Sequence, residues 1–420
     1  MTHSLFPPSA FPAPAPVGRI PVTLLTGFLG AGKTTFLNWL TRCPTMVGAA
    51  VLINEFGEVG LDHHLVDFVD ESLVILESGC LCCTMRGDLV AALKGLHGRL
   101  SRRELPALTR IVIETTGLAD PVPVINTLME DRFVAARFVC DGILTVVDAT
   151  RALDQIARHT EARRQVAVAD RLLISKTDLA DRATGLALER RLKDMNPAAT
   201  ILDLDTIRRS GTGDPACLFG ALDGLADKGA NLARWLGEEG AQRASDDRHN
   251  GPPRQGRDLS GHHDNAVRSF VVRFDDPVPW YGFAVTMGLI LQTYGARLLR
   301  MKGLMNSIAD IRPVIVQGVQ AVAYPLARLS GWPAGNFADQ RGCLVFICDG
   351  LHETEEAEIR AALSNLPTDS AALRMAAATP LLPTRCWLKD RLPMTLDGLP
   401  RHDAFVIQAP PFSLGRRRSA

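Results

Sequence analysis

The sequence predicts an α/β fold, in which a mostly parallel sheet covered by helices on both faces is followed by a smaller α+β domain. Three observations support this prediction. Short apolar runs alternate with helical stretches from residue 20 onward, as in parallel strands joined by helices. Each run ends in a glycine or polar cluster, where ligands bind in open α/β sheets. A second set of apolar runs begins near residue 267, after a polar segment.

Composition divides the chain into five segments. Residues 1–18 are rich in Pro and Ala and are expected to form a disordered arm. Residues 19–225 carry the parallel-sheet domain, and residues 266–366 carry the α+β domain. Residues 226–265 are expected to form a flexible linker, because the stretch 237–265 within them contains almost no apolar side chains. Residues 367–420 are less regular and are interpreted as a C-terminal extension.

Individual elements follow from the apolar runs and the helical stretches between them. In the first domain, strands are expected at 20–27, 49–57, 73–80, 110–117, 142–150 and 171–179, and helices at 33–42, 86–97 and 151–164. In the second domain, strands are expected at 266–274, 296–303, 312–323 and 342–350, and helices at 279–293 and 353–364.

Composition also limits the function classes. Hydrophobic residues make up 46% of the 420 residues and charged residues 22%, as in ordinary globular proteins. The 46 basic and 46 acidic residues balance, which argues against a nucleic acid or an anionic membrane as the main partner. No apolar run approaches the length of about 18 residues needed to span a bilayer, and no signal peptide is apparent, so we expect a cytoplasmic protein.

A phosphate-binding loop is indicated by the stretch "TGFLGAGKTT". It fits the pattern G-x-x-x-x-G-K-[ST] directly after a predicted strand and before a predicted helix, the context in which backbone N–H groups surround phosphate oxygens. Lys33 is expected to reach the outer phosphates, and the Thr34 hydroxyl to coordinate Mg²⁺. The predicted nucleotide-binding residues are Gly27, Phe28, Leu29, Gly30, Ala31, Gly32, Lys33, Thr34 and Thr35.

Two further strand ends complete the predicted nucleotide site. In "RIVIETTGLADP", Glu114 ends a strand and is expected to hold Mg²⁺ through water, while the Gly117 backbone would meet the terminal phosphate. In "ISKTDL", the Asp178 carboxylate can accept both N–H donors of a guanine edge, and the Lys176 stem can flank the base. These motifs together favour GTP over ATP.

A cluster of cysteines lies in "GCLCCTMRGDL". Cys80, Cys82 and Cys83 are expected to bind a soft or borderline metal ion, because thiols stay reduced in the cytoplasm and thiolates bind such ions. Three ligands leave one position open, which suits a site that releases its metal. A vicinal disulfide or inert packing of these cysteines are the alternatives. Candidates for a fourth ligand in "NEFGEVGLDHH" are Glu55, Glu58, His63 and His64.

These motifs give the chain a resemblance to the CobW-like P-loop GTPases, a family of metal-handling proteins. "MNPAATI" in the first domain and "LLRMKGL", "RPVIVQGVQ" and "RGCLVFICDGL" in the second also resemble that family. The resemblance implies a P-loop domain followed by a CobW-type C-terminal domain, the three cysteines as the metal site, and residues 175 to 178 as the base-reading segment. Ser175 departs from the commoner Asn, and we expect this to remove an amide that braces the loop.

The resemblance implies a GTP-hydrolysing metallochaperone that delivers zinc or cobalt to a client metalloprotein. Lys33, Thr34 and Glu114 are the predicted catalytic residues, GTP and Mg²⁺ the predicted cofactors, and intrinsic turnover is expected to be slow. GTP with Mg²⁺ would order residues 54–64 and 114–120. A homodimer is compatible with the sequence. A non-enzymatic metal buffer or sensor with a structural nucleotide, and a P-loop kinase or ATPase, remain alternatives.

Overall fold

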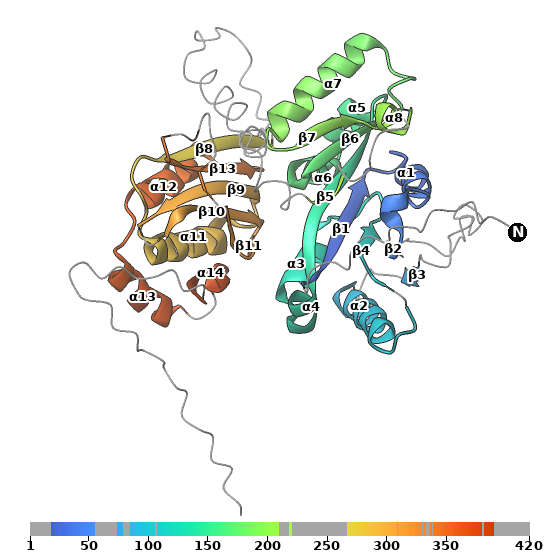
Figure 1. Cartoon of the computed structure of the whole chain (residues 1–420). Coiled ribbons are helices and arrows are strands. Elements are labelled where there is room, and N and C mark those ends of the chain that lie inside the picture. Colours follow the sequence, from blue (N-terminus) through green and yellow to red (C-terminus); the bar gives the residue numbers. More distant parts are fainter. Residues whose placement is uncertain are drawn as a thin grey trace, which may run out of the picture.

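The protein folds into two domains that lie side by side (Figure 1). The structure, a computed structural model, describes residues 18–54, 74–78, 85–105, 107–209, 218–220, 267–308, 310–329, 331–332, 337, 339–379 and 382–389. The predicted arm at 1–18, apart from its last residue, and the predicted linker at 226–265 lie outside these residues.

The first domain is built on a seven-stranded sheet of order β3-β2-β4-β1-β5-β6-β7, in which every pair of neighbours is parallel. The strands are β1 (Ile20–Gly27), β2 (Ala49–Asn54), β3 (Val74–Ser78), β4 (Arg110–Glu114), β5 (Phe138–Asp148), β6 (Arg171–Ser175) and β7 (Thr200–Asp203). The predicted parallel sheet is thus confirmed. The seventh strand, β7, is an addition, because its four residues are only half-buried and form no long apolar run.

Helices cover both faces of this sheet. On one face lie α1 (Lys33–Leu40) and α8 (Leu204–Arg209), and a short 3-10 helix (Pro44–Met46) follows α1. On the other face lie α2 (Met85–Ser101), α3 (Val122–Glu130), α4 (Arg132–Arg137), α5 (Ala152–Arg158), α6 (Thr160–Val168) and α7 (Arg182–Met195). Successive side chains of a strand point to opposite faces of the sheet. Leu24 packs toward α2 and α3, and Leu25 packs toward α1. Such strands are apolar throughout because both faces are buried.

The single helix predicted at 151–164 is wrong, because this stretch contains the two helices α5 and α6. They meet at His159, whose backbone is extended (φ −118°, ψ 124°). The break coincides with a long-range contact, since the His159 ring packs on the ring of Phe28 at a centroid distance of 4.7 Å. The sequence carries no Gly or Pro at this point to signal the break.

The second domain contains an antiparallel sheet of order β11-β10-β9-β13-β8, with β12 paired to β10. The strands are β8 (Arg268–Phe274), β9 (Leu298–Ser307), β10 (Asp310–Val319), β11 (Val322–Ala323), β12 (Ala327–Arg328) and β13 (Gly342–Cys348). Helices α11 (Trp280–Tyr294) and α12 (Glu353–Ser364) pack on it through a shared core. The predicted α+β layer is confirmed.

Two helices beyond residue 366 belong to the packing of this domain, although the sequence analysis assigned them to an extension. They are α13 (Asp369–Ala378) and α14 (Arg385–Lys389). Trp387 is fully buried, its indole N–H donates to the carbonyl of Tyr324 at 2.7 Å, and its own carbonyl accepts from Trp280 at 3.2 Å. The Asp369 carboxylate accepts two backbone N–H groups at the start of α11. Residues 369–389 therefore complete the domain.

Two truncations test this assignment. Deleting residues 367–420 removes the buried Trp387, and we expect the second domain to lose at least about 3 kcal/mol, the typical cost of removing one buried Trp side chain. Deleting only residues 390–420 should leave the melting temperature of that domain nearly unchanged. Thermal unfolding followed by tryptophan fluorescence compares the two chains. Equal melting temperatures would contradict the assignment.

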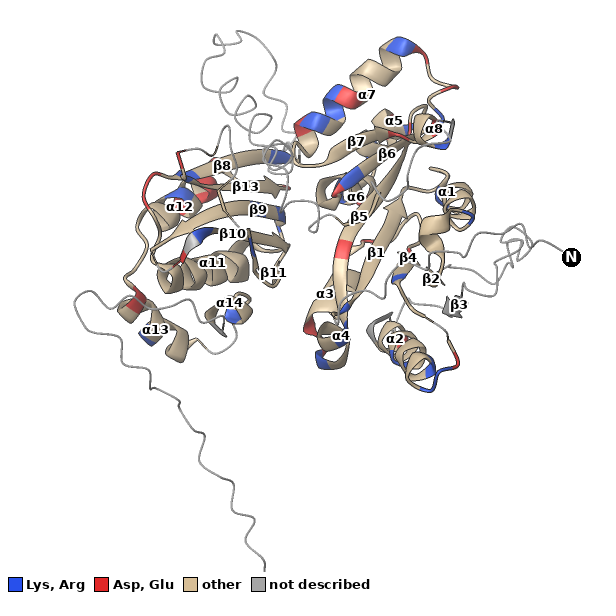
Figure 2. Cartoon of the chain, in the orientation of Figure 1, with Lys and Arg blue, Asp and Glu red and all other residues tan. Residues whose placement is uncertain are grey.

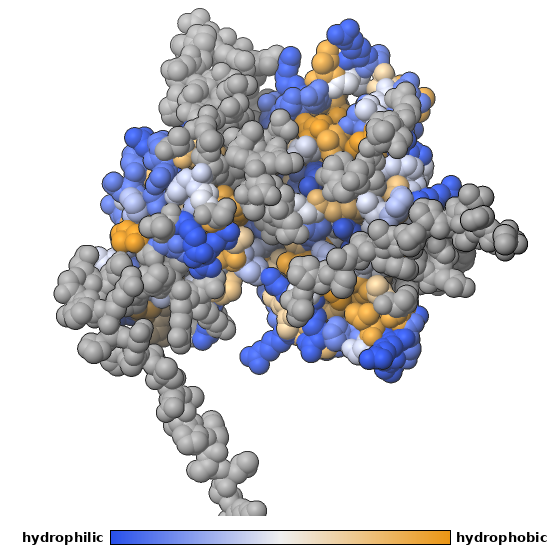
Figure 3. All heavy atoms as spheres, viewed as in Figure 1, coloured by the Kyte–Doolittle hydropathy of each residue, from blue (hydrophilic) through white to orange (hydrophobic). Residues whose placement is uncertain are grey.

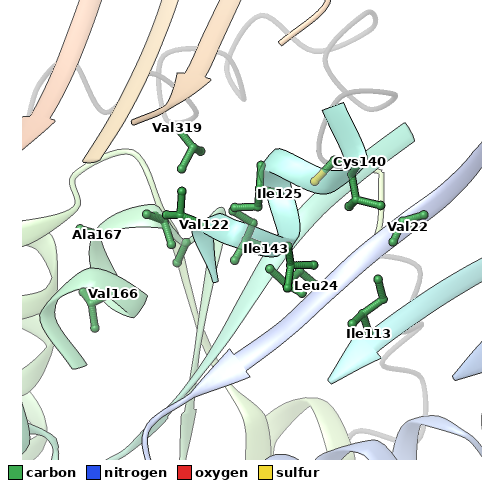
Figure 4. Packing of buried hydrophobic residues seen from close by; sticks show 14 of the residues in the cluster. Val22, Leu24, Ile113, Val122, Ile125, Cys140, Ile143, Val166, Ala167 and Val319 are labelled. Carbon is green, nitrogen blue, oxygen red and sulfur yellow. The ribbon is translucent and has the colours of Figure 1, made fainter. Parts of the chain in front are cut away.

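The two domains share an apolar core at their boundary. Leu299, Val319, Tyr324 and Ile347 of the second domain belong to the same buried cluster as α2, α3 and α6 of the first. Figure 4 shows Val319 of β10 pointing toward Val122 of α3. Because these side chains are removed from water only while the domains stay in contact, the boundary resists separation.

Charged residues gather on helices, including α7 and α12, whereas the strands are mostly uncharged apart from a few positions such as a basic stretch on β9 (Figure 2).

On the face shown in Figure 3, apolar surface forms small areas separated by polar ones. Among the described residues, no helix combines the length and apolar character that crossing a membrane requires.

Candidate functional site

The predicted phosphate loop joins the end of β1 to the start of α1 at the carboxyl edge of the first sheet. Its curvature depends on glycine at two positions in particular. Gly27 has φ +145°, and a Cβ there would stand 2.4 Å from the carbonyl oxygen of Val146. Gly32, the residue before α1, has φ +95°, a left-handed conformation that side chains rarely adopt. The loop therefore takes the shape in which backbone N–H groups can surround an anion.

Lys33 places its ammonium group inside this loop. Its Nζ donates to the carbonyl oxygens of Gly27 at 2.9 Å and Phe28 at 3.4 Å, and the residue is only 9% exposed. The side chain thus folds back over the loop, where the outer phosphates of a nucleotide are expected. A buried ammonium next to a phosphate loop favours an anion as a ligand.

Thr34 and Glu114 meet beside the loop. The Thr34 hydroxyl donates to the Glu114 carboxylate at 3.3 Å, and Glu114 is 5% exposed. The register of the strands brings these two side chains together. Glu114 at the end of β4 lies opposite Leu25 of β1, and the phosphate loop that leads to Thr34 begins at the end of β1. A hydroxyl and a carboxylate next to a phosphate loop are hard oxygen donors, so the residues present fit Mg²⁺.

The segment after β4 lies against the phosphate loop. Thr115 donates its backbone N–H to Leu25 at 2.9 Å and its hydroxyl to Thr26 at 2.8 Å. A Cβ on Gly117 would stand 2.6 Å from the Cα of Leu29, so only glycine allows this approach. The structure thus brings Gly117 to the loop.

The stretch predicted to read the base, residues 175 to 178, begins at the end of β6. The Ser175 hydroxyl donates to the carbonyl of Ala31 at 2.7 Å, so the side chain still braces the phosphate loop. The amide that Asn would supply is absent here, and the Ser175 hydroxyl makes this one contact with the loop. Asp178 is exposed.

Lys176 joins three parts of the site. Its backbone is left-handed (φ 57°), and its ammonium donates to the Gly30 carbonyl at 2.8 Å and to the Asp148 carboxylate at 2.6 Å. Burial by itself would raise the pKa of Asp148, but hydrogen bonds from Lys176 and Thr150 outweigh it and hold the pKa below its ordinary value. The Asp148 charge therefore fixes the Lys176 side chain over the phosphate loop.

Sequence reasoning missed several residues that support the site. Asp148 ends β5 as Glu114 ends β4, and this position at a strand end was the available signal. The Thr177 hydroxyl donates to Asp203 at 3.3 Å and Asp205 at 3.2 Å, which ties the base-reading stretch to the end of β7. Gln165 in α6 gave no signal, because its role depends on contacts with a segment 46 and 48 residues away.

The predicted metal ligands lie outside the described residues. They are Cys80, Cys82, Cys83, Glu55, Glu58, His63 and His64. Within the described ranges, no group of three or more His, Cys, Asp or Glu side chains is placed to hold a metal ion. The strand that precedes the cysteines, β3, is described: it ends at Ser78, opposite Asn54 of β2, at the same edge as β4 and β1.

Comparison with known proteins identifies the family. The model of the CobW/HypB/UreG nucleotide-binding domain matches residues 21–203, and that of the cobalamin synthesis protein CobW C-terminal domain matches residues 267–366. The zinc chaperone YjiA of Escherichia coli is 33% identical over 347 residues, which are 83% of this chain and 98% of that protein. The chain belongs to the CobW family.

Other CobW-family comparisons agree with this assignment. The zinc-regulated GTPase metalloprotein activator 1 of Schizosaccharomyces pombe is 34% identical over 192 residues, which are 44% of this chain and 45% of that protein. The crystal structure of Zn(II)-bound YjiA GTPase from Escherichia coli has a TM-score of 0.58 and 28% identity, and covers 84% of this chain and 100% of that one. The CobW fold, with its nucleotide-binding and C-terminal domains, thus extends over most of this chain.

Proposed function

We propose that this CobW-family protein is a GTP-hydrolysing metallochaperone that binds zinc at Cys80, Cys82 and Cys83 and delivers it to a client metalloprotein. One observation carries the proposal: the phosphate loop, the Thr34–Glu114 pair and the strand leading to the cysteines all end at one edge of the first sheet. Two relatives support the proposal by their names: one is called a zinc chaperone and the other a zinc-regulated GTPase metalloprotein activator.

In this proposal the described residues divide the work on GTP. The loop from Gly27 to Thr35 encloses the phosphates through its N–H groups, and Lys33 leaves its carbonyl partners to neutralise the outer phosphates. Mg²⁺ held by Thr34 and Glu114 would offset charge on the phosphate oxygens. Ser175 and Lys176 hold the base-reading stretch to the loop, and Asp178 accepts from the guanine edge.

The cysteines suit a releasable cargo ion. Thiolates prefer zinc among the available divalent ions, and three of them leave one position for Glu55, Glu58 or a client's ligand. Cobalt is the second cargo that this donor set accepts. In the strand order β3-β2-β4-β1, three interstrand spacings of about 4.8 Å separate β3 from β1, or roughly 14 Å at this edge. That separation is short enough for one movable segment to contact both sites.

Coupling between the two ligands follows from that proximity. GTP with Mg²⁺ would order residues 114–120 and 54–64, which follow β4 and β2 between the two sites. Hydrolysis removes the terminal phosphate and the contacts it made, and the metal site then changes its affinity by the same coupling energy. A client that binds the GTP-ordered segments would receive the metal on release.

The test is the zinc affinity of the protein with GppNHp, with GDP and without nucleotide, measured by competition with a chromophoric chelator. We expect at least about a tenfold difference between the GppNHp and GDP forms, or roughly 1.4 kcal/mol of coupling. Cys80→Ser, Cys82→Ser and Cys83→Ser combined should remove this zinc site. Cys386→Ser, at an exposed cysteine in α14, is the control and should behave as wild type. Equal affinities in all nucleotide states would instead support a metal buffer or sensor.

A further inference from the structure

Gln165 in α6 connects that helix to the segment after β4. Its side chain is almost fully buried, with 1% of the residue exposed. Both hydrogens of the amide are used: Nε2 donates to the carbonyl of Gly117 at 3.1 Å and to the carbonyl of Ala119 at 3.0 Å. One side chain therefore fixes two carbonyls of a three-residue stretch.

That stretch is the part of the segment that touches the phosphate loop. A Cβ on Gly117 would stand 2.7 Å from the backbone nitrogen of Leu29, so the two backbones are in direct contact. An adjacent ion pair supports the same arrangement, since Arg164 of α6 contacts the Asp120 carboxylate at 3.1 Å. Helix α6 thus contacts residues 117–120 through two adjacent side chains, Arg164 and Gln165.

We propose that Gln165 is a positioning residue for GTP, because its amide holds the backbone from Gly117 to Ala119 where the terminal phosphate is bound. This inference rests on the proposed GTPase function and adds to it the element that distinguishes GTP from GDP. Gln165 itself makes no contact with nucleotide. It acts through Gly117, whose backbone meets the terminal phosphate that GDP lacks.

The chemistry of the amide explains why glutamine is suited to this place. Two carbonyl oxygens need two donors, and the amide NH₂ group of Gln or Asn is the uncharged side-chain group that supplies both. The amide oxygen of Gln165 is buried and has no hydrogen-bond partner among the described residues, so the side chain is held by its donors alone. Losing the amide would leave two inward carbonyls without this partner, and the segment would be free to move away from the loop.

Gln165→Met keeps the length of the side chain and removes both donors. We expect the affinity for GppNHp to fall about 10- to 100-fold and the affinity for GDP to change less than about threefold, because only the triphosphate reaches Gly117. The turnover number for GTP should fall together with the affinity for GppNHp. Fluorescent analogues of GppNHp and GDP, titrated against the full chain, measure the two affinities. Equal losses for both nucleotides, or no loss, would overturn the inference.

Gln165→Glu gives a second readout that a purely structural role would not produce. An ionised carboxylate cannot donate and repels the two carbonyls, but a protonated carboxyl donates once, and burial raises the pKa of a Glu. The neighbouring residue in the sequence, Arg164, pairs with Asp120. GppNHp affinity relative to wild type should therefore recover as pH falls from 8 to about 5.5. A pH-independent ratio would contradict the proposed donor role.

Gln155→Met is the matched control. Gln155 of α5 and Gln165 of α6 both line a small cavity beside Phe28. The structure shows no hydrogen bond from Gln155 to Gly117 or Ala119. Its GppNHp and GDP affinities should equal those of wild type. If the wild-type chain binds GppNHp and hydrolyses GTP while Gln165→Met does the same, only this inference fails. If the wild-type chain does neither, the proposed function fails and the inference fails with it.

Discussion

Lys33→Ala is expected to weaken binding of GTP and GDP by at least about 100-fold and to reduce GTP hydrolysis to background. The reason is the position of the ammonium, which lies 2.9 Å from the carbonyl of Gly27 within the phosphate loop and is nearly buried. A charged donor in so enclosed a site contributes more to binding a phosphate than it would in water, where ions screen it. Titration with fluorescent GDP and a phosphate-release assay measure the two effects.

Lys193→Ala provides the matched control for this prediction. Lys193 is an exposed lysine of α7 that pairs with Glu189 on the same helix, a pair worth well under 1 kcal/mol. The variant removes the same charge from the same chain and should bind and hydrolyse GTP as wild type does. Hydrolysis that survives in Lys33→Ala would show that nucleotide binds elsewhere.

The second large effect is expected at a buried charge cluster that joins the two domains. Asp170, directly before β6, contacts Arg300 of β9 in an ion pair and Lys302 of β9 at 3.1 Å. Arg300 also donates to the carbonyl of Val168 at the end of α6, at 3.1 Å. The exposed fractions of the three charged side chains are 7%, 2% and 1%. One acidic group thus pairs with two buried basic groups.

Asp170→Asn should destabilise the protein by about 3 to 5 kcal/mol, because it removes the negative charge that Asp170 places beside two buried cations. Lys302→Met should cost less than about 1 kcal/mol, because Asp170 and Arg300 still form a balanced pair. Differential scanning calorimetry separates the variants: the first should lower the melting temperature by roughly 6 to 20 °C, and the second by a few degrees at most. Similar losses in both variants would contradict the charge-balance explanation.

The same cluster predicts how stability depends on pH. Burial favours the neutral form of Asp170, but Arg300 and Lys302 outweigh burial and lower its pKa to about 2, so its contribution is present above about pH 4 and is lost between pH 4 and 2. Burial lowers the pKa of Lys302 from 10.5 to about 8. Between pH 8 and 10.5, Lys302 is more protonated in the unfolded chain than in the folded protein. The free energy of unfolding therefore increases as pH rises through this range. Lys302→Met should remove that rise.

Both β9 residues of the cluster stand in "LLRMKGL", which the sequence analysis noted only as part of the family resemblance. Lysine is scarce, with seven in the chain, and three of the seven contact the phosphate loop or the domain boundary. Lys33 and Lys176 hold the phosphate loop, and Lys302 joins the domains. The first two could be anticipated, because each lies in a local motif. Lys302 could not, because its partner is more than 130 residues away.

The sequence by itself determined the parallel sheet, the phosphate loop and the strand ends that carry Glu114, Gly117 and Ser175. These features are local: apolar runs specify buried strands, and the glycines of the loop specify backbone angles within a few residues. The predicted boundaries of β1 and α12 agree with the structure to the residue.

Only the tertiary structure decided the break at His159, the packing of α13 and α14 on the second domain, the two carbonyls held by Gln165, and the three charges shared by Asp170, Arg300 and Lys302. The physical reason is common to all four. Each depends on side chains that meet across many residues of chain, and the burial that makes those contacts strong exists only after the sheet and the two domains have formed.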